Sequence, residues 1–300
     1  MDANLISVID KFGTDDKCRA TLEHLRWPEG VTCPECQSKK ISRISTRNVF
    51  DCDSCRYQFS VTVGTIFNDT HLPLTKWFIA TYIMIESQKG VSANQLKRMI
   101  GVSYKTAWYL CHRIRRAMTE ACPEPLGNES STVECDEKYT GGRRRYVGSG
   151  HVGNKTTVLG AKERGGQVRM AAEKRRTRKA LHAFITANTD PQTERIHKDE
   201  NPAYLGIEDA DTKHETVNRH TEERVRGCVY TNSVENVWSL LKRSIIGSYH
   251  QVSAKHLDAY LDELEWRFNN RDNPYLFRDT LIRLIKSPKM EFKSLIEKSA

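Results

Sequence analysis

The sequence predicts an α+β protein of several domains, and three observations lead to this fold class. Residues 32–67 are rich in Cys, Ser, Val and aromatic residues in short alternating stretches, which is typical of small strands. Residues 74–116 have the apolar spacing of helices. After residue 131, strand-like stretches come first and helical spacing dominates the last third of the chain, which indicates a second, larger α+β unit.

Composition limits the classes of protein to consider. The 300 residues suffice for two or three modest cores, and 47 Lys and Arg against 38 Asp and Glu give a formal charge of +9. This excess of positive charge favours a polyanionic partner such as a nucleic acid. No apolar run approaches the roughly 18 residues of a membrane span, and the N-terminal residues lack the pattern of a secretory signal. We therefore expect a cytoplasmic protein that does not act at a membrane.

Changes in composition divide the chain into five predicted segments. These are N-terminal helices with a strand-rich unit at 1–70, a helical region at 71–122, a linker at 123–131, an α+β domain at 132–286 and a tail at 287–300. The linker, PEPLGNESS, marks the main boundary because its Pro, Gly, Ser and Asn residues favour turns over regular elements.

Two cysteine pairs predict a structural zinc site. Cys33 and Cys36 form one C-x2-C pair, and after fifteen residues Cys52 and Cys55 form the second. This spacing is typical of a tetrahedral Zn²⁺ site with four thiolates, which leaves no position open for water. A redox pair is disfavoured because no thioredoxin-like pattern surrounds either motif. We expect buried thiols at the other cysteines, with the first of them an alternative zinc ligand: Cys18, Cys111, Cys122, Cys135 and Cys228.

A helix-turn-helix pattern follows the cysteines. Ser92 is placed to cap a helix over 94–100, Gly101 permits a left-handed turn, and Ser103 is placed to cap a second helix. Basic and hydroxyl side chains on the second helix are candidate DNA contacts in the major groove. The four candidates are Lys105, Thr106, Arg113 and Arg116. An ordinary helical hairpin with a solvated basic face remains the alternative.

Three carboxylates form a candidate catalytic metal site. Asp136 ends a predicted strand, Asp199 follows a second one, and Glu235 begins a predicted helix, with Asn232 one turn before it and Lys242 two turns after it on nearly the same face. Two divalent cations need oxygen ligands from separate elements, and three such residues supply them. Chance is the alternative, because a chain with 38 acidic residues places some of them at strand ends without any function.

Several longer motifs extend these observations over nearly the whole chain. They are DEKYTGG at 136–142, VGNKTTVLGAKERGGQVRM at 152–170, DENPAY at 199–204 and YTNSVENVWSLLKRSIIGSYHQVSAKHLDAYLDELEWRFNNR at 230–271. With the cysteine pairs, they resemble bacterial insertion-sequence transposases that have an N-terminal zinc ribbon and a DDE integrase-type domain, the ISXO-like family. The sequence departs from the family pattern at Lys198, where Thr is usual, and at Tyr230, where His is usual.

The resemblance implies an RNase H-like fold, in which a mixed sheet is flanked by helices. Asp136 on its first strand, Asp199 after its fourth and Glu235 on a following helix become the ligands of Mg²⁺ or Mn²⁺. Asn232 and Lys242 become auxiliary contacts near the DNA end. The implied activity is cleavage and transfer of DNA strands.

The resemblance also implies partners: double-stranded DNA, as the terminal inverted repeats of the element and as its target, and further copies of the chain in a homo-oligomer. A location at the nucleoid of a bacterium is expected. Two alternatives remain open, which are a non-catalytic DNA-binding regulator derived from a mobile element and a metal-dependent nuclease without transfer activity.

Overall fold

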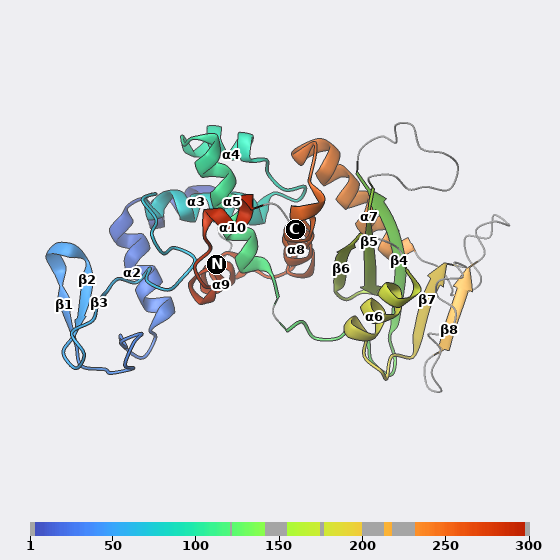
Figure 1. Ribbon diagram of the computed structural model, residues 1–300, viewed down its shortest axis with the longest axis horizontal. Helices are drawn as coiled ribbons and strands as arrows, with labels where there is room; N and C mark the ends of the chain where they lie inside the picture. The colour runs from blue at the N-terminus through green and yellow to red at the C-terminus, as the bar shows by residue number, and fades with distance from the viewer. Residues whose placement is uncertain are drawn as a thin grey trace. The chain divides into compact units, whose positions relative to one another are not determined.

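The computed structural model describes residues 4–120, 122–141, 155–174, 177–199, 213–217 and 232–297. It divides into two compact units (Figure 1). The first contains residues 1–118 and 272–300, and the second contains residues 119–271. The sequence places residues 119–122 in the helical region and ends the second domain at residue 286, so the predicted and observed boundaries differ at 119–122 and at 272–286.

The first unit combines helices with one small sheet. Its helices are α1 (Leu5–Phe12), α2 (Asp15–Arg26), α3 (Leu74–Glu86), α4 (Ala93–Ile100), α5 (Tyr104–Met118), α9 (Leu276–Lys286) and α10 (Phe292–Ile296). Its strands are β1 (Ile41–Ile44), β2 (Val49–Cys52) and β3 (Gln58–Phe59), which pair antiparallel in that order. The sheet therefore lies within the strand-rich stretch that the sequence predicts.

Aromatic packing explains why α9 belongs to the first unit. The ring of Phe277 lies 5.8 Å from that of Phe12, 6.1 Å from that of Phe78 and 5.9 Å from that of Tyr82, measured between centroids. These rings come from α1 and α3. Helical spacing in the sequence identifies the apolar face of such a helix but not the partner that covers it.

Helices α4 and α5 begin where the sequence predicts. The Ser92 hydroxyl accepts a hydrogen bond from the N–H of Gln95 at 3.1 Å, and the Ser103 hydroxyl accepts one from the N–H of Thr106 at 3.1 Å. Between the helices, Gly101 has φ +63°, a conformation that costs other residues a steric clash with Cβ. The local signals for this pair of helices are thus confirmed.

The second unit is a mixed sheet flanked by helices, as the sequence predicts. Its strands are β4 (Thr132–Thr140), β5 (Thr156–Glu163), β6 (Val168–Glu173), β7 (Arg195–Asp199) and β8 (Lys213–Val217), and its helices are α6 (Arg178–Asn188), α7 (Asn232–Ser244) and α8 (Leu257–Asn269). The strand order is β6-β5-β4-β7-β8. Strands β4, β5 and β6 pair antiparallel, and β7 and β8 run parallel to β4.

Alternating residues of the sheet build two cores on its opposite faces. Val133 and Cys135 pack with Leu181 and Ile185 of α6, which crosses one face of the sheet (Figure 1). On the other face, Val158 belongs to the core formed by α7 and α8. The period of two along a strand explains why β4 presents Val133 and Cys135 to α6 but Glu134 and Asp136 to α7.

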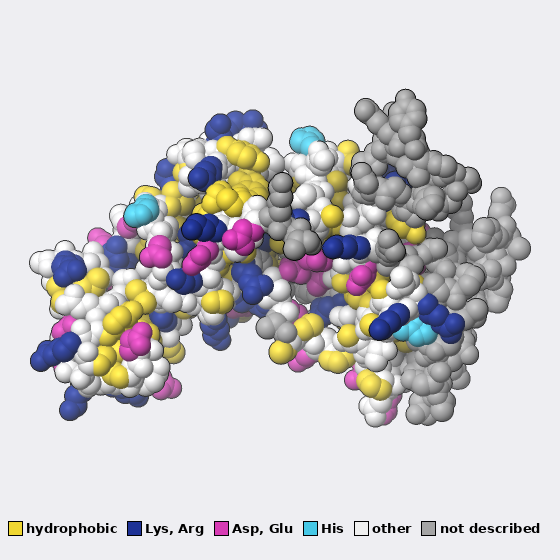
Figure 2. All heavy atoms as spheres, in the orientation of Figure 1, with side chains coloured by type: hydrophobic (Ala, Val, Ile, Leu, Met, Phe, Trp, Pro, Cys, Tyr) yellow, Lys and Arg dark blue, Asp and Glu magenta, His cyan; other side chains and the backbone are white. Residues whose placement is uncertain are grey.

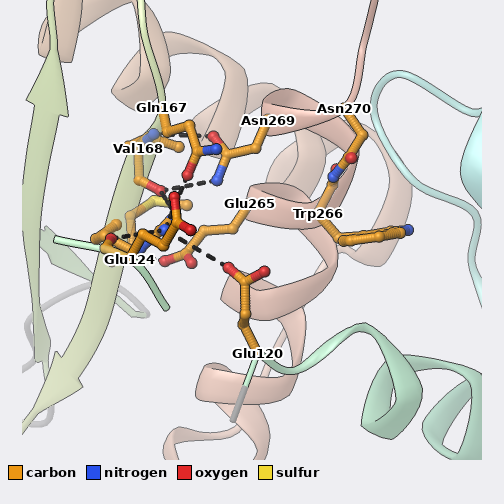
Figure 3. Close-up of polar contacts among 10 residues, drawn as sticks. Glu120, Glu124, Gln167, Val168, Glu265, Trp266, Asn269 and Asn270 are labelled. Atoms are coloured by element: carbon orange, nitrogen blue, oxygen red, sulfur yellow. Dashed lines mark hydrogen bonds and ion pairs between the residues drawn. The ribbon is translucent and has the colours of Figure 1, made fainter. Parts of the chain in front are cut away.

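Helix α8 blocks the outer edge of the sheet. Strand β6 is an edge strand, whose free N–H groups would invite pairing with another chain. Three side-chain oxygens of α8 accept these N–H groups, and two of the accepting residues, Glu265 and Asn269, are labelled in Figure 3. Val168 donates to Asn269 at 2.8 Å, Met170 donates to Glu265, and Ala172 donates to Asp258 at 2.8 Å.

A buried arginine fixes the start of the second unit to the same edge. Arg169 is 4% exposed, and its guanidinium donates to the Glu124 carbonyl oxygen at 3.1 Å and to Gln167 Oε1 at 2.8 Å. It also pairs with Glu120 at 3.5 Å (Figure 3). These contacts hold the segment that precedes β4 against β6.

Glu265 gives the second unit a predicted pH dependence. Burial, with a smaller contribution from Asp262, raises the pKa of Glu265 from 4.5 to about 8. A carboxyl with a raised pKa binds its proton more tightly in the folded chain, so its contribution to stability is complete below about pH 4.5 and is lost as the pH rises towards 8. Glu265→Gln keeps an acceptor for the Met170 N–H without a charge. We expect it to be more stable than wild type by about 2–4 kcal/mol at pH 8 and equally stable near pH 4.5.

Urea denaturation of both proteins at the two pH values measures this difference. Parallel pH profiles for wild type and Glu265→Gln would show that the carboxyl titrates normally.

Candidate functional site

The two cysteine pairs lie together and form the predicted cluster. All four Sγ atoms lie within 4.8 Å of one another, with Cys33 Sγ 3.6 Å from Cys55 Sγ and Cys36 Sγ 3.5 Å from Cys52 Sγ. Four thiolates around Zn²⁺, at Zn–S distances of about 2.3 Å, would lie about 3.8 Å from one another. The spacing and the all-sulfur donor set are therefore compatible with a structural zinc ion.

Two similar turns aim the thiols inward. The N–H of Gln37 donates to the Cys33 carbonyl at 3.0 Å, and the N–H of Arg56 donates to the Cys52 carbonyl at 2.7 Å. Gln37 and Arg56 each follow the second cysteine of a pair and have φ of 59° and 63°. The repeated C-x2-C spacing thus produces the same tight turn twice.

The protonation of the cluster also suits a metal. Although burial opposes it, hydrogen bonds from the backbone of Cys55 and Ser54 lower the pKa of Cys52 to about 6, whereas burial and contacts with the neighbouring thiols raise the pKa of Cys55 to about 12. A thiolate is the form that binds zinc. Cys18, the alternative ligand, lies outside the cluster: its thiol donates to the Phe12 carbonyl at 3.3 Å, and burial raises its pKa to about 12.

Burial of the remaining cysteines agrees with the sequence in part. Cys111 and Cys135 are buried as predicted, whereas Cys122 is exposed. Cys122 lies beside the Pro-rich linker, away from any helix or strand that would cover it. Cys228 lies outside the described residues.

Asp136 lies in β4, 9% exposed, on the face that α7 covers. Its Oδ2 accepts a hydrogen bond from Trp238 Nε1 at 2.9 Å. Gly160 pairs with Asp136 in β5, and a Cβ at Gly160 would lie 2.5 Å from the Trp238 ring. A side chain at Gly160 would therefore displace the indole that holds this carboxylate. A glycine inside a strand is the sequence signal for such a close approach.

Asp199 is the last residue of β7, which lies next to β4. The parallel register pairs Cys135 with Lys198, so Asp136 and Asp199 each follow one residue later on neighbouring strands. The backbone therefore brings the two aspartates to the same level of the sheet. The side chain of Asp199 lies outside the described part of the structure.

Helix α7 carries the other candidates. Asn232 is its first residue, Glu235 lies in its first turn and Lys242 lies in its last, and all three side chains are exposed. The opposite side of α7 is buried through Val237 and Leu241. Glu235 is three residues before Trp238 on α7. Because Trp238 donates a hydrogen bond to Asp136, the helix that carries Glu235 is in direct contact with Asp136.

Helix α5 presents only some of the four predicted DNA contacts. Lys105 and Arg116 are exposed and Thr106 is half-buried. Arg113 is 5% exposed, and its guanidinium donates to the carbonyl oxygens of Ile66 and Asn68. It therefore holds the segment before α3 against α5 instead of facing outward, contrary to the sequence prediction.

Aromatic rings explain the burial of Arg113. Its guanidinium lies 4.7 Å from the ring centroid of Trp77 and 5.1 Å from that of Tyr109. Two aromatic faces and two carbonyl groups stabilise this cation away from water, while its Nε is buried without a hydrogen-bond partner among the described residues. Helical spacing alone did not reveal this, because the rings come from both α3 and α5.

Charge is spread over the surface. Figure 2 shows basic side chains over both units with acidic ones between them, seen from one side. Three consecutive arginines at residues 143–145 lie outside the described residues. Within the described part of the chain, no helix is long and apolar enough to cross a membrane.

Comparisons with known proteins match both units. Residues 13–58 match the transposase zinc-ribbon domain, and residues 128–269 match the ISXO2-like transposase domain. An uncharacterized protein in transposable element ISH50 of Halobacterium salinarum is 29% identical over 279 residues, which cover 86% of this chain and 92% of that protein. The crystal structure of the Mos1 strand transfer complex aligns with a TM-score of 0.31 and 10% identity over 70% of this chain and 75% of that one.

The first match includes all four clustered cysteines, and the second includes Asp136, Asp199 and Glu235. The chain therefore contains a transposase zinc-ribbon domain at residues 13–58, followed by an ISXO2-like transposase domain at residues 128–269.

Proposed function

We propose that the chain is a DDE-type transposase that binds the terminal inverted repeats of an insertion sequence and catalyses metal-dependent cleavage and transfer of DNA strands. The observation that carries this proposal is the meeting of three elements. Asp136 and Asp199 stand at the same level of neighbouring strands, and α7, which bears Glu235, packs on the Asp136 face.

The topology of the second unit supports an RNase H-like interpretation. Three antiparallel strands are followed by two strands that run parallel to the first, in the order β6-β5-β4-β7-β8. Asp136 is then on the first strand of the unit, Asp199 ends the fourth, and Glu235 is on a later helix. These are the positions that the family resemblance implies for the metal ligands.

The donor set suits hard cations. Asp136, Asp199 and Glu235 offer carboxylate oxygens only, which Mg²⁺ and Mn²⁺ prefer, whereas the thiolates of the ribbon suit Zn²⁺. Bound cations would activate the attacking hydroxyl and stabilise the leaving oxygen of an in-line displacement. The chain itself holds the Asp136 carboxylate in place through Trp238.

Basic residues would position the DNA. Lys242 is seven residues after Glu235, two turns along nearly the same side of α7, where its ammonium group would meet a phosphate beside the reacting strand. Asn232, one turn before Glu235, offers an amide near the same carboxylate. Both are auxiliary contacts in this proposal.

The first unit would recognise the element ends. Lys105 and Arg116 are eleven residues apart, about 16 Å along one side of α5, with Thr106 beside the first of them. We assign α5 as the DNA-contacting helix of a helix-turn-helix and the zinc ribbon as its partner module. Two ends must be joined in one reaction, so we also propose that the chain acts as a homo-oligomer.

A strand-transfer assay tests the proposal. Purified protein, Mg²⁺ and DNA with the ends that flank its own gene should give joined products with wild type and none with Asp199→Asn. Asp190→Asn is the matched control, because the Asp190 carboxylate accepts the Gln192 N–H in the turn before β7 and an amide oxygen can replace it there. If wild type binds the ends but does not cleave them, a non-catalytic DNA-binding regulator is favoured. If it cleaves the ends but does not join them to target DNA, a metal-dependent nuclease is favoured.

A further inference from the structure

Glu134 is a fully buried acidic residue two positions before Asp136 on the same face of β4. Its Oε2 accepts the N–H of Ser233 at 2.8 Å and the N–H of Val234 at 3.1 Å. These donors are the second and third residues of α7. The carboxylate therefore caps the helix that carries Glu235, where free N–H groups and the helix dipole favour a negative charge.

The other oxygen of Glu134 connects to the neighbouring strand. Arg164 Nε donates to Glu134 Oε1 at 2.7 Å, and a second guanidinium nitrogen of Arg164 lies 2.9 Å from His197 Nδ1. His197 pairs with Glu134 in the parallel register of β4 and β7, and it is fully buried. Arg164 is itself anchored, since its N–H donates to the Thr132 carbonyl at 3.0 Å.

Three elements thus meet at one carboxylate, and each carries one of the proposed metal ligands. Asp136 follows Glu134 by two residues on β4, Asp199 follows His197 by two residues on β7, and Glu235 directly follows Val234 on α7. Both carboxylate oxygens of Glu134 are used in these links. Loss of its charge would leave a half-buried guanidinium and two helix N–H groups without their anionic acceptor.

We propose that Glu134 is a positioning residue that sets the separation of Asp136, Asp199 and Glu235 through Arg164, His197 and the first turn of α7. This inference rests on the proposed function, because it concerns the same three ligands. Partners that orient metal ligands from behind commonly change metal affinity or activity by about 10- to 100-fold when they are removed.

Glu263 provides a matched control for the effect of removing a buried charge. It is also fully buried in the second unit, pairs with Arg267 at 3.4 Å and accepts a hydrogen bond from the Tyr249 hydroxyl at 2.9 Å. These two contacts come from α8 itself and from the π-helical segment Ile245–Tyr249 after α7. A purely structural role for Glu134 predicts that Glu134→Gln and Glu263→Gln behave alike.

Binding of Mn²⁺ to the full-length, zinc-loaded chain tests the proposal, with free Mn²⁺ measured by electron paramagnetic resonance. We expect Glu134→Gln to raise the dissociation constant about 10-fold, Glu263→Gln to leave it within about twofold of wild type, and Asp136→Asn to remove the site. In the strand-cleavage assay, excess Mg²⁺ should restore part of the rate of Glu134→Gln. Circular dichroism reports whether each variant is folded.

The Mn²⁺ affinities of the variants separate the positioning role of Glu134 from the proposed function. Equal Mn²⁺ affinity of wild type and folded Glu134→Gln would overturn the positioning role while leaving the proposed function intact. Equal binding by wild type and Asp136→Asn would overturn the proposed function and this inference with it. If Glu134→Gln does not fold, Arg164→Lys replaces it, because it keeps the charge but loses the fork between Glu134 and His197. Wild-type affinity in Arg164→Lys would then contradict the proposal.

Discussion

Asp136→Asn is expected to reduce strand cleavage by at least about 10³-fold while the chain stays folded and binds DNA as wild type does. The amide oxygen can still accept the Trp238 N–H, so the packing of α7 on β4 is preserved. The substitution removes only the negative charge, which a divalent cation needs in its ligand. Single-turnover cleavage of an end-labelled DNA measures the loss of rate, and an unfolding curve for each protein shows whether the fold is retained.

Trp238→Phe changes the same site less severely than Asp136→Asn does. It removes the N–H that holds Asp136 but keeps a ring over Gly160, so a smaller loss of rate is expected than for Asp136→Asn. Wild-type cleavage by Asp136→Asn would remove Asp136 from the catalytic set, whatever the result for Trp238→Phe.

Cys33→Ser is expected to remove zinc from the chain, unfold the ribbon and abolish specific binding to the element ends. The small core around Phe50 and Phe59 cannot compensate, because structural zinc contributes about 10–16 kcal/mol of apparent binding free energy in comparable small domains. Zinc content by atomic absorption, proteolysis of the N-terminal segment and a DNA mobility shift measure the three effects.

Cys122→Ser is the matched control, since Cys122 is exposed and outside the cluster. It should bind one zinc ion per chain and bind DNA like wild type. Full zinc content and full end binding in Cys33→Ser would contradict the assignment of the four thiols as one structural site.

Local signals in the sequence account for much of this architecture. The C-x2-C spacing predicts the cysteine cluster because it determines a turn that involves only neighbouring residues. Ser92, Gly101 and Ser103 predict the ends of α4 and α5 for the same reason. Capping and left-handed turns depend on a few adjacent residues, so a single sequence contains the whole signal.

Tertiary contacts account for what the sequence did not reveal. Arg113 is a basic residue on a predicted DNA-contacting helix, and the sequence therefore favours an exposed side chain. Its burial depends on Trp77 and on two carbonyl groups more than forty residues away. Glu134 looks like one acidic residue among 38, and only the register of β4 with β7 and the approach of α7 show its contacts. Helix α9 likewise packs on the first unit through Phe277 and Phe12, and the apolar spacing of α9 does not indicate this partner.

The most direct test of the account is a crystal of the protein grown with its DNA ends and Mn²⁺, with anomalous diffraction recorded to locate the metal. We expect density within about 2.5 Å of carboxylate oxygens of Asp136 and Glu235, with Asp199 as the third ligand. Density at other carboxylates, or none near Asp136 at saturating Mn²⁺, would contradict it.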